Sequence, residues 1–337
     1  MRYKVAILFG GEGVEREVSL AGANFLSRYI DRELFNPIFV EISKDGGWYK
    51  DGKEAVFPVL LQGVSGFLTS GTPEAIDAVF PLLHGDMGED GNIQGALQAA
   101  HIPFVGCPTL SGALAADKIA AKAAARSIGI PVCRDTALFE QEPHRPNTER
   151  AREIAEREIG YPMFIKPSGL GSSVGAAAVF ERQGFKEAYE NAAALGGGRV
   201  LVEEYLGERR ELECAWLEYD GKIFVSPPAE IKCEASFYSY EEKYLPDSTV
   251  KLIPRAEISK KICDTAREYT LRIAELLGCR DLCRVDFFLV KDTLIFNEIN
   301  TMPGLTEASL WLRLAEGSGL SRTEIVSALL LQAIGRR

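Results

Sequence analysis

The chain has few of the residues that bind zinc or form disulfide frameworks. It contains only three histidines, and its seven cysteines are an odd number with no CxxC pair. A zinc site normally draws on several histidines or paired cysteines, so none is expected here. Unpaired cysteines in this number are typical of reduced thiols in a cytosolic protein. The sequence therefore predicts a cytoplasmic protein without a zinc site.

Positive charge and long apolar runs are also scarce. The 38 Lys and Arg residues are outnumbered by 48 Asp and Glu, which gives a formal net charge of −10. Nucleic acids and anionic membranes are bound by clustered cations, so neither is expected as a partner. No run approaches the about 20 apolar residues of a membrane helix. The apolar start at Val5–Phe9 is too short for a signal peptide.

The length of 337 residues and a hydrophobic content of 46% predict two or three domains with substantial cores. Strand-like runs at Val5–Phe9, Phe35–Ile42 and Ala78–Leu83 are separated by helical or loop segments, which predicts a small parallel α/β domain. A glycine-rich turn and a helix from about Glu15 follow the first run. The turn resembles a dinucleotide fingerprint, but Arg16 stands at the third glycine position.

Two apolar runs near the C-terminus, Cys283–Val290 and Leu294–Ile299, predict a β-hairpin. Side chains alternate along a strand, so the register decides which polar groups meet. A loop with an odd number of residues, most simply Lys291 to Thr293, gathers four polar side chains on one patch. In that register Asp286 lies opposite Glu298, and Arg284 lies opposite Asn300. An even loop sends the two pairs to opposite faces.

Two carboxylates and one amide oxygen form an all-oxygen ligand set that suits Mg²⁺ or Mn²⁺. A magnesium ion held by few protein oxygens usually completes its shell with phosphates, so the patch indicates a nucleotide site. The alternative is a solvated hairpin face with scattered charges. Pro303-Gly304 ends the second strand sharply and leaves the Gly304 amide free to approach a ligand.

Further cations occur in the middle of the chain. An alanine-rich helix is expected over Leu110–Ser127, with Lys118 and Lys122 one turn apart, and each taken alone is expected to be solvated. Lys166 precedes a Gly/Ser-rich loop between two strands, an order that excludes a P-loop. The loop instead fits a hairpin lid whose amides close over phosphates, although a plain turn is the alternative.

Three more segments carry candidate polar groups. Glu203 and Glu204 end a strand, and Glu211 follows; their carboxylates either accept from an adenine amino group and ribose hydroxyls or are solvated. His84 ends the strand Ala78–Leu83, where such sheets place ligands, and a structural role is equally compatible. The polar stretch that contains Lys243 and Tyr244 is expected to be a long loop acting as a lid.

Seven blocks of sequence together carry a family resemblance. They are VEREVSL (14–20), LLHGDMGEDG (82–91), ADKIAAK (116–122), FIKPSGLGSSVG (164–175), FYSYEEKYL (237–245), CRVDFF (283–288) and NEINTMPGLTEASL (297–310). In this order, and over essentially the whole chain, they resemble the D-alanine–D-alanine ligases of the ATP-grasp superfamily. Any one block is weak, but the full set is specific.

The resemblance implies an α/β (α+β) ATP-grasp fold of three domains. Residues 1–106 would form an N-terminal domain with a Rossmann-like parallel sheet, residues 107–199 a central domain with the lid, and residues 200–337 a C-terminal domain with the metal site. A first D-alanine carboxylate would attack the γ-phosphate of ATP. The amine of a second D-alanine would attack the resulting acyl phosphate, and the dipeptide would supply peptidoglycan synthesis. The family also suggests a homodimer.

The resemblance further implies a role for each matching residue. Two Mg²⁺ or Mn²⁺ ions would be held by Asp286, Glu298 and Asn300. ATP would be bound by Lys118, Lys166, Ser173, Glu203, Glu204, Leu206 and Glu211. The catalytic set would be Glu15, Ser172, Tyr244, Arg284 and Gly304, with His84, Lys243, Ser309 and Leu310 at the substrates. The family often has lysine where Glu204 stands, but that contact is largely through the backbone.

The second substrate is not decided by the fold, because relatives that use D-serine or D-lactate share this machinery. Tyr244 lies in a loop that lactate-using relatives replace, and Leu310 stands where serine-using relatives tend to have a polar group. Both residues favour D-alanine. Another ATP-grasp ligase would keep the metal hairpin but not the EREVSL and YEEKY blocks. A nicotinamide enzyme is suggested only by the first glycine turn, and a non-catalytic nucleotide-binding protein would not need the acidic set.

Overall fold

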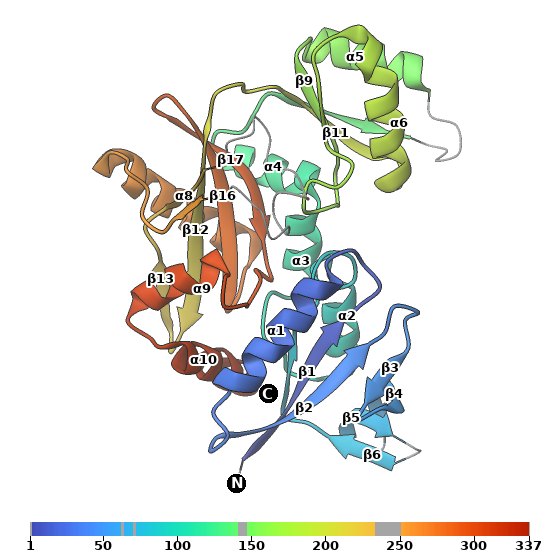
Figure 1. Ribbon diagram of the computed structural model, residues 1–337, viewed down its shortest axis with the longest axis vertical. Coiled ribbons are helices and arrows are strands. Elements are labelled where there is room, and N and C mark those ends of the chain that lie inside the picture. Colours follow the sequence, from blue (N-terminus) through green and yellow to red (C-terminus); the bar gives the residue numbers. More distant parts are fainter. Residues whose placement is uncertain (1, 62–63, 70–71, 141–146, 233–250, 337) are drawn as a thin grey trace.

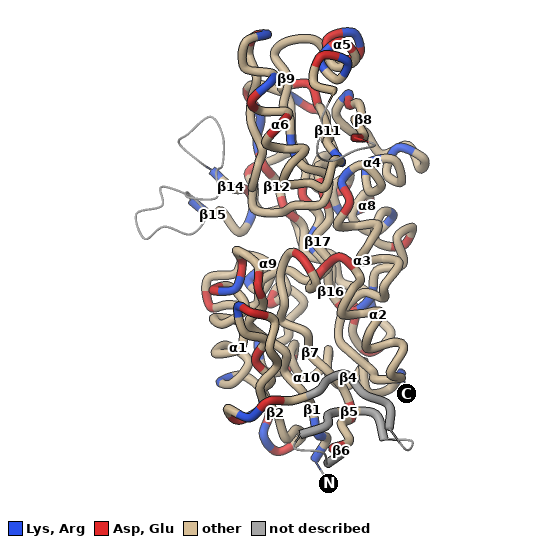
Figure 2. Tube along the Cα trace, turned by 90° about the vertical axis from the view of Figure 1, so that its right-hand side faces the viewer, with Lys and Arg blue, Asp and Glu red and all other residues tan. Residues whose placement is uncertain are grey.

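The computed structural model describes residues 2–61, 64–69, 72–140, 147–232 and 251–336. Three β-sheets are stacked along the long axis of the molecule, each made from its own part of the chain (Figure 1). The view turned by 90° shows the same stacking, with the strands of the third sheet between the other two (Figure 2). Within the described residues, no helix has the length and apolar character needed to cross a membrane.

The first sheet has seven strands in the order β6-β5-β4-β3-β2-β1-β7. Its strands are β1 (Tyr3–Gly10), β2 (Phe35–Ile42), β3 (Trp48–Lys50), β4 (Lys53–Leu61), β5 (Val64–Thr69), β6 (Thr72–Ala75) and β7 (Ala78–Pro81), and its helices are α1 (Arg16–Tyr29) and α2 (Asn92–Ala99). β1 pairs in parallel with β2 and β7, as the sequence predicts, and β3–β6 add an antiparallel extension that it does not predict.

The second sheet has the order β10-β9-β11-β8 and lies at the opposite end of the molecule (Figure 1). It comprises β8 (Asp135–Phe139), β9 (Met163–Pro167), β10 (Ala177–Val179) and β11 (Arg199–Glu204), with α5 (Thr148–Glu158), η1 (Arg182–Gly184) and α6 (Phe185–Leu195). The Gly/Ser-rich loop connects the antiparallel strands β9 and β10, as expected of a hairpin. Aliphatic and aromatic side chains of α5, α6 and these strands form one core.

The third sheet runs β15-β14-β12-β16-β17, with β13 paired to β12. Its elements are β12 (Arg210–Tyr219), β13 (Lys222–Val225), β14 (Ala229–Lys232), β15 (Lys251–Ile253), α8 (Lys260–Leu277), β16 (Leu282–Val290), β17 (Thr293–Asn300), α9 (Leu310–Ala315), η2 (Glu316–Ser318) and α10 (Arg322–Ile334). The odd-numbered residues of β16 from 283 to 289 are buried, and the even-numbered ones from 284 to 290 are less so. This alternation turns Arg284 and Asp286 away from the core.

The hairpin register agrees with the prediction, but the loop length does not. Val290 pairs with Thr293, so the loop is the two residues Lys291 and Asp292 rather than three. An even loop alone would separate the two polar pairs. A β-bulge between Asp286 and Phe287 adds one residue, Asn297, to β17. The bulge shifts the register by one, so Asp286 lies opposite Glu298 and Arg284 lies opposite Asn300.

The alanine-rich helix also differs from the expectation, because it is two helices. α3 (Thr109–Ala116) and α4 (Lys118–Ser127) are separated by Asp117, whose backbone is extended (φ −83°, ψ 104°). The Asp117 side chain accepts a hydrogen bond from the Ala120 amide at 3.0 Å and so caps α4. The break creates a helix N-terminus at Lys118, whose amide donates to the Ser168 carbonyl in the loop after β9 at 3.0 Å.

Candidate active site

An open cavity lies between the second and third sheets. Its walls come from α4, β9, the loop before β10, β11, β12, β16 and β17. Eleven of the residues that the sequence selects line it, namely Lys118, Lys166, Ser172, Ser173, Glu203, Glu204, Leu206, Glu211, Arg284, Asp286 and Glu298. These residues are far apart along the chain, so the tertiary structure is what brings them together.

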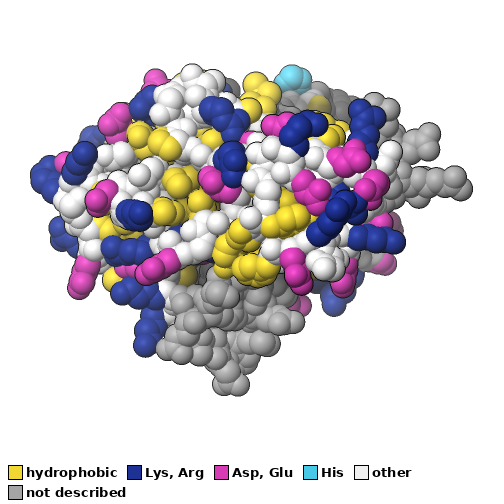
Figure 3. Space-filling model, turned by 90° about the horizontal axis from the view of Figure 1, so that it is seen from above, with side chains coloured by type: hydrophobic (Ala, Val, Ile, Leu, Met, Phe, Trp, Pro, Cys, Tyr) yellow, Lys and Arg dark blue, Asp and Glu magenta, His cyan; other side chains and the backbone are white. Residues whose placement is uncertain are grey.

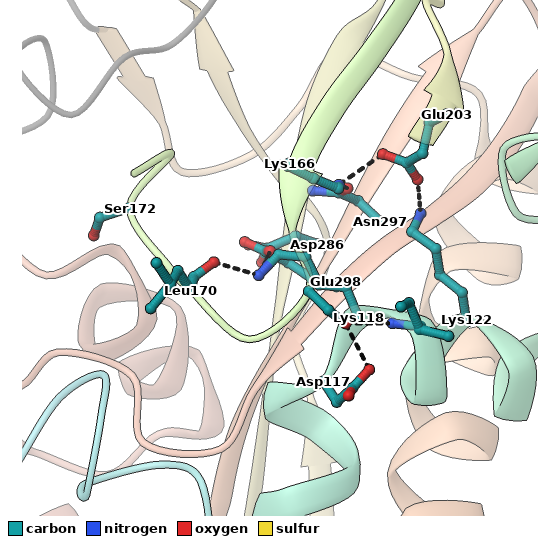
Figure 4. Close-up of polar contacts among 12 residues, drawn as sticks. Asp117, Lys118, Lys122, Lys166, Leu170, Ser172, Glu203, Asp286, Asn297 and Glu298 are labelled. Atoms are coloured by element: carbon teal, nitrogen blue, oxygen red, sulfur yellow. Dashed lines mark hydrogen bonds and ion pairs between the residues drawn. The ribbon is translucent and has the colours of Figure 1, made fainter. Parts of the chain in front are cut away.

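Lys118 occupies the first turn of α4 and points into the cavity (Figure 4). Its Nζ donates to the Leu170 carbonyl at 2.7 Å and lies 3.4 Å from Glu298 Oε2. Asp117 anchors this end of α4, since its carboxylate accepts from Ser168 Oγ at 2.6 Å and from Arg199 Nε at 2.9 Å. A buried lysine is thereby held between the lid loop and the acidic hairpin.

Lys166 and Lys122 share one carboxylate, that of Glu203. Lys122 Nζ is 2.6 Å from Glu203 Oε1, and Lys166 Nζ is 2.7 Å from Glu203 Oε2 (Figure 4). Burial alone would raise the pKa of Glu203, but the two ammonium groups outweigh it and bring that pKa to about 2. Burial, together with the nearby Lys122 and Lys118, lowers the pKa of Lys166. Two cations facing one anion leave net positive charge, which suits a phosphate group.

Lys122 is not solvated, contrary to the expectation for an isolated helical lysine. Its side chain is 1% exposed, and it also donates to the Phe296 carbonyl at 3.3 Å. Burial would lower the pKa of Lys122, but the Glu203 carboxylate outweighs that effect and raises it. The ion pair with Glu203 compensates for the loss of water around the ammonium group.

Arg284 on β16 is held by two carboxylates. Its Nε and Nη2 donate to the two oxygens of Asp286 at 2.8 and 2.7 Å, and Nε lies 3.2 Å from Glu213 Oε2. Glu213 comes from the neighbouring strand β12, where it lies directly opposite Asp286. Burial would lower the pKa of Arg284, but these two carboxylates raise it well above its usual value. A permanently charged guanidinium therefore stands in the cavity wall.

The acidic residues of the hairpin fit a divalent cation in their chemistry. Asp286 and Glu298 lie opposite each other across β16 and β17, and Asn300 follows two residues later on β17. In the described part of the chain no three His, Cys, Asp or Glu side chains are grouped to hold a metal. A third protein ligand would thus be the Asn300 carboxamide, whose Oδ1 accepts from the Met302 amide at 3.1 Å. Such hard oxygens suit Mg²⁺ or Mn²⁺.

Glu15 and Ser172 meet across a long sequence separation. Ser172 Oγ donates to Glu15 Oε1 at 2.6 Å, which joins the lid loop to the start of α1. A Cβ placed on Gly85 would lie 2.8 Å from Glu15 Oε2, so this turn also approaches the carboxylate. Tyr244, the expected third member of this set, and Lys243 lie outside the described residues.

His84 is buried and lies near the carboxylate of Glu15. Its Nδ1 is 3.1 Å from the Met302 carbonyl and 3.5 Å from Glu89 Oε1, and its Nε2 has no hydrogen-bond partner among the described residues. Burial would lower the pKa of His84, but Glu89 and then Glu15 outweigh it and raise that pKa. An unpartnered Nε2 is suited to receive a ligand group.

The segment after β17 places Gly304 beside Ser309. A Cβ on Gly304 would come within 3.3 Å of Ser309 Oγ, so the backbone passes close to this hydroxyl. Ser309 Oγ in turn accepts from the Thr306 amide at 2.9 Å. Leu310 begins α9 and is buried. Gly304, Ser309 and Leu310 do not line the cavity, nor do Glu15, His84 and Asn300.

At the far end of the cavity, the residues after β11 form an apolar and acidic wall. Glu204 Oε1 accepts from the Arg134 amide at 3.0 Å, so its carboxylate is engaged by neighbouring backbone. Glu211 Oε1 accepts from Arg209 Nη2 at 3.2 Å. The Arg209 guanidinium lies 4.9 Å from the centre of the Phe288 ring. Tyr205 and Leu206 complete a surface that a flat heterocycle could contact.

The glycine turn after β1 is occupied by protein groups. The Arg16 guanidinium donates to the Gly11 carbonyl at 3.1 Å and forms an ion pair with Glu41. A Cβ on Gly10 would lie 2.6 Å from Arg16 Nη1. A side chain therefore fills the space where a dinucleotide-binding turn needs its third glycine.

The set that the sequence selects lacks several polar residues of the site, among them Glu213, Asn297 and Lys122. Glu213 could have been found, because it stands two residues after Glu211 on one strand, and residues two apart share a face. Asn297 lines the cavity, and its Oδ1 is 3.5 Å from Lys166 Nζ, but no sequence signal announces the bulge that exposes it. Lys122 stands out in the sequence only as a helical neighbour of Lys118. Its burial depends on Glu203, which is far away in sequence.

Comparison with known proteins gives a consistent result over the whole chain. Family models described as "D-ala D-ala ligase N-terminus" and "D-ala D-ala ligase C-terminus" match residues 4–107 and 125–331. A D-alanine–D-alanine ligase of Deinococcus radiodurans is 39% identical, with 100% of both chains covered. D-alanine–D-alanine ligase A of Mesorhizobium japonicum is 36% identical, with 99% of this chain and 98% of the relative covered.

Solved structures agree in fold. The VanG D-Ala:D-Ser ligase of Enterococcus faecalis superimposes with a TM-score of 0.88 at 34% identity, over 99% of this chain and 100% of that chain. D-alanyl-alanine synthetase A of Vibrio cholerae gives a TM-score of 0.86 at 30% identity and covers 99% of each chain.

Proposed function

This chain belongs to the D-alanine–D-alanine ligase family, and on that premise we propose that it joins two D-alanine molecules in an ATP-dependent reaction. The observation that carries the proposal is the shared cavity. Two buried lysines, the acidic hairpin and Arg284 converge there from separate elements. Such a convergence of cations, carboxylates and amides is what phosphoryl transfer to a carboxylate requires.

In this proposal the lysines and the lid bind ATP. Lys118 and Lys166 neutralise the phosphates, and Ser173 with the lid amides closes over them. Glu203, Glu204, Leu206 and Glu211 frame the adenine and ribose. Lys166 is suited to its role because it shares Glu203 with Lys122, which leaves positive charge for a ligand.

The first D-alanine would be held by Glu15, Ser172 and Tyr244, with His84 and Lys243 nearby. Its carboxylate oxygen attacks the γ-phosphorus of ATP, the bond to the β-phosphate breaks, and D-alanyl phosphate and ADP are formed. The amine of the second D-alanine, whose carboxylate lies at Ser309 and Leu310, then attacks the carbonyl carbon, and phosphate leaves. Arg284 and the Gly304 amide would stabilise the tetrahedral oxyanion, each worth about 3 kcal/mol in comparable sites.

Two Mg²⁺ or Mn²⁺ ions would be held by Asp286, Glu298 and Asn300. When bound, such ions supply charge neutralisation on the transferring phosphates. The residues themselves would contribute the fixed oxygen ligands and the orientation, which the rigid pairing of β16 and β17 provides.

A second candidate is a D-alanyl-D-serine ligase, because the VanG D-Ala:D-Ser ligase is a close structural relative. The apolar Leu310 argues against it, since a serine hydroxyl requires a polar partner. Mass spectrometry of the product formed from competing D-alanine, D-serine and D-lactate tests the choice. D-Alanyl-D-alanine is expected, and a predominant mixed product at neutral pH would overturn D-alanine as second substrate.

The activity itself is tested by ADP release with ATP and Mg²⁺. ADP should appear only when D-alanine is added, because phosphorylation requires an acceptor carboxylate. Release that ignores D-amino acids would instead favour another ATP-grasp ligase. A nucleotide-dependent absorbance change with NADH would favour a nicotinamide enzyme.

Further parts of the proposal follow from the family. We propose three domains with boundaries near residues 106 and 199, a homodimer, a cytoplasmic location and a role in supplying the dipeptide for peptidoglycan. Light scattering after size-exclusion chromatography tests the dimer, for which twice the chain mass of 36.9 kDa is expected.

A further inference from the structure

Each carboxylate of the acidic hairpin already has a cationic partner. Asp286 pairs with both Nε and Nη2 of Arg284, and Glu298 lies 3.4 Å from Lys118 Nζ. A divalent ion that takes these carboxylates, as in the proposed function, must displace both cations. A buried cation that loses its partner is costly unless another anion replaces it. Lys118 would have the phosphates of ATP as its new partner.

For Arg284 the replacement anion is already present. Glu213 is 6% exposed, lies opposite Asp286 across β12 and β16, and places Oε2 3.2 Å from Arg284 Nε. Nε thus lies within reach of both carboxylates, so it can stay with Glu213 when Asp286 leaves.

We propose that Glu213 is a positioning residue that retains Arg284 when Asp286 turns to the metal ions. This inference rests on the proposed function and deepens it. In the exchange, Nε stays on Glu213, Asp286 is released to act as a ligand, and the Nη groups are freed to face the oxyanion. In this proposal the carboxylate of Glu213 acts through Arg284, with which it forms an ion pair.

The test is Glu213→Gln, which keeps the shape of the side chain and removes its charge. Asp286 would then be the carboxylate that holds the Arg284 guanidinium, so Arg284 competes with the metal for it. Binding of Mn²⁺ is measured by electron paramagnetic resonance with a non-hydrolysable ATP analogue present. The dissociation constant should rise by about tenfold, the scale of residues that orient metal ligands. In the assay, kcat should fall more than KM for ATP changes.

Glu230→Gln is the matched control. Glu230 is also a buried glutamate of this sheet, paired through both oxygens with Arg210 at 2.8 and 2.7 Å, but it does not line the cavity. Loss of the Glu230 charge should lower the stability about as much as Glu213→Gln does, and it should leave the Mn²⁺ affinity unchanged. An equal effect of both variants on Mn²⁺ affinity would mean that only general destabilisation is observed, and would overturn the proposal.

A double-mutant cycle with Arg284→Met separates positioning from a direct effect of charge. If Glu213 acts through Arg284, Glu213→Gln should have no further effect on Mn²⁺ affinity once Arg284 is replaced. The same loss in both backgrounds would show direct attraction of the ion and overturn the proposal. Unchanged Mn²⁺ affinity in the single variant Glu213→Gln would by itself overturn the proposal. A wild-type protein that binds no Mn²⁺ would overturn the proposed metal site as well.

Discussion

At the scale of single residues, the site is a set of shared charges. Glu203 serves two lysines, and Arg284 serves two carboxylates. Two lysines around one carboxylate leave positive charge for an incoming phosphate, whereas a cation that binds Asp286 has to displace Arg284 from it. These residues are nevertheless buried or half-buried, which strengthens the interactions among them.

Replacing Glu298 by Gln should abolish most activity without unfolding the protein. The substitution removes one carboxylate charge from the proposed metal site and keeps the side-chain volume. Turnover should fall by about 10³-fold, since metal ions contribute several kcal/mol to such reactions. Steady-state kinetics and thermal unfolding measure the two effects. Near-normal turnover would remove Glu298 from the metal site.

Replacing Glu203 by Gln should lower the stability at neutral pH by about 3 kcal/mol, because it leaves two buried ammonium groups without their anion. The pKa of Glu203 lies below its ordinary value, so its contribution is present above pH 4.5 and lost as the pH falls toward about 2. The variant should therefore lose less stability than the wild type over that range. Urea unfolding at several pH values measures this, and parallel curves would contradict it.

At the scale of elements, two irregularities shape the site. The break at Asp117 gives α4 an N-terminus beside the lid, and the bulge at Asn297 sets the register of the acidic hairpin. Neither feature adds to the regular hydrogen bonding of its element. Each instead orients charged side chains that a continuous helix or an unbulged strand would direct elsewhere.

Deleting Asn297 should remove the bulge and keep the acidic residues in register. Glu298 would then follow Phe296 directly and take the place opposite Asp286, so it would still face the cavity while Ile299 stays in the core. Turnover and melting temperature of the deletion variant should therefore stay close to those of Asn297→Ala, which keeps the bulge. Kinetics and thermal unfolding of the two variants provide the comparison. A much larger loss in the deletion variant would show that Glu298 does not replace Asn297 opposite Asp286.

At the scale of the whole molecule, the candidate site lies between two of the three sheets and is connected to the third. Figure 3 shows the upper end, where Lys and Arg side chains alternate with Asp and Glu and hydrophobic side chains lie between them. The functional charges lie instead between the second and third sheets (Figure 4). The hydrogen bond from Ser172 to Glu15 connects the lid with the start of α1. This contact couples lid position to the N-terminal part of the chain.

Ser172→Ala should weaken binding of the first D-alanine by about tenfold, since a hydrogen bond to a charged group is worth about 1.5 kcal/mol. The KM for D-alanine measures this, and the melting temperature should stay close to that of the wild type. Glu15→Gln should act in the same direction. The double variant should be no weaker than the stronger single one, because both remove the same contact. Additive effects would show that the two residues act separately.

The sequence by itself determined most of the strands and helices around the site, the grouping of polar residues into motifs and the hairpin that carries Asp286 and Glu298. Local alternation and spacing are sufficient for these, because they depend on neighbours along the chain. Only the tertiary structure decided that Lys122 is buried, that Glu213 supports Arg284 and that a bulge corrects an even loop. These features depend on contacts between segments distant in sequence, and burial and charge pairing arise only when the sheets come together.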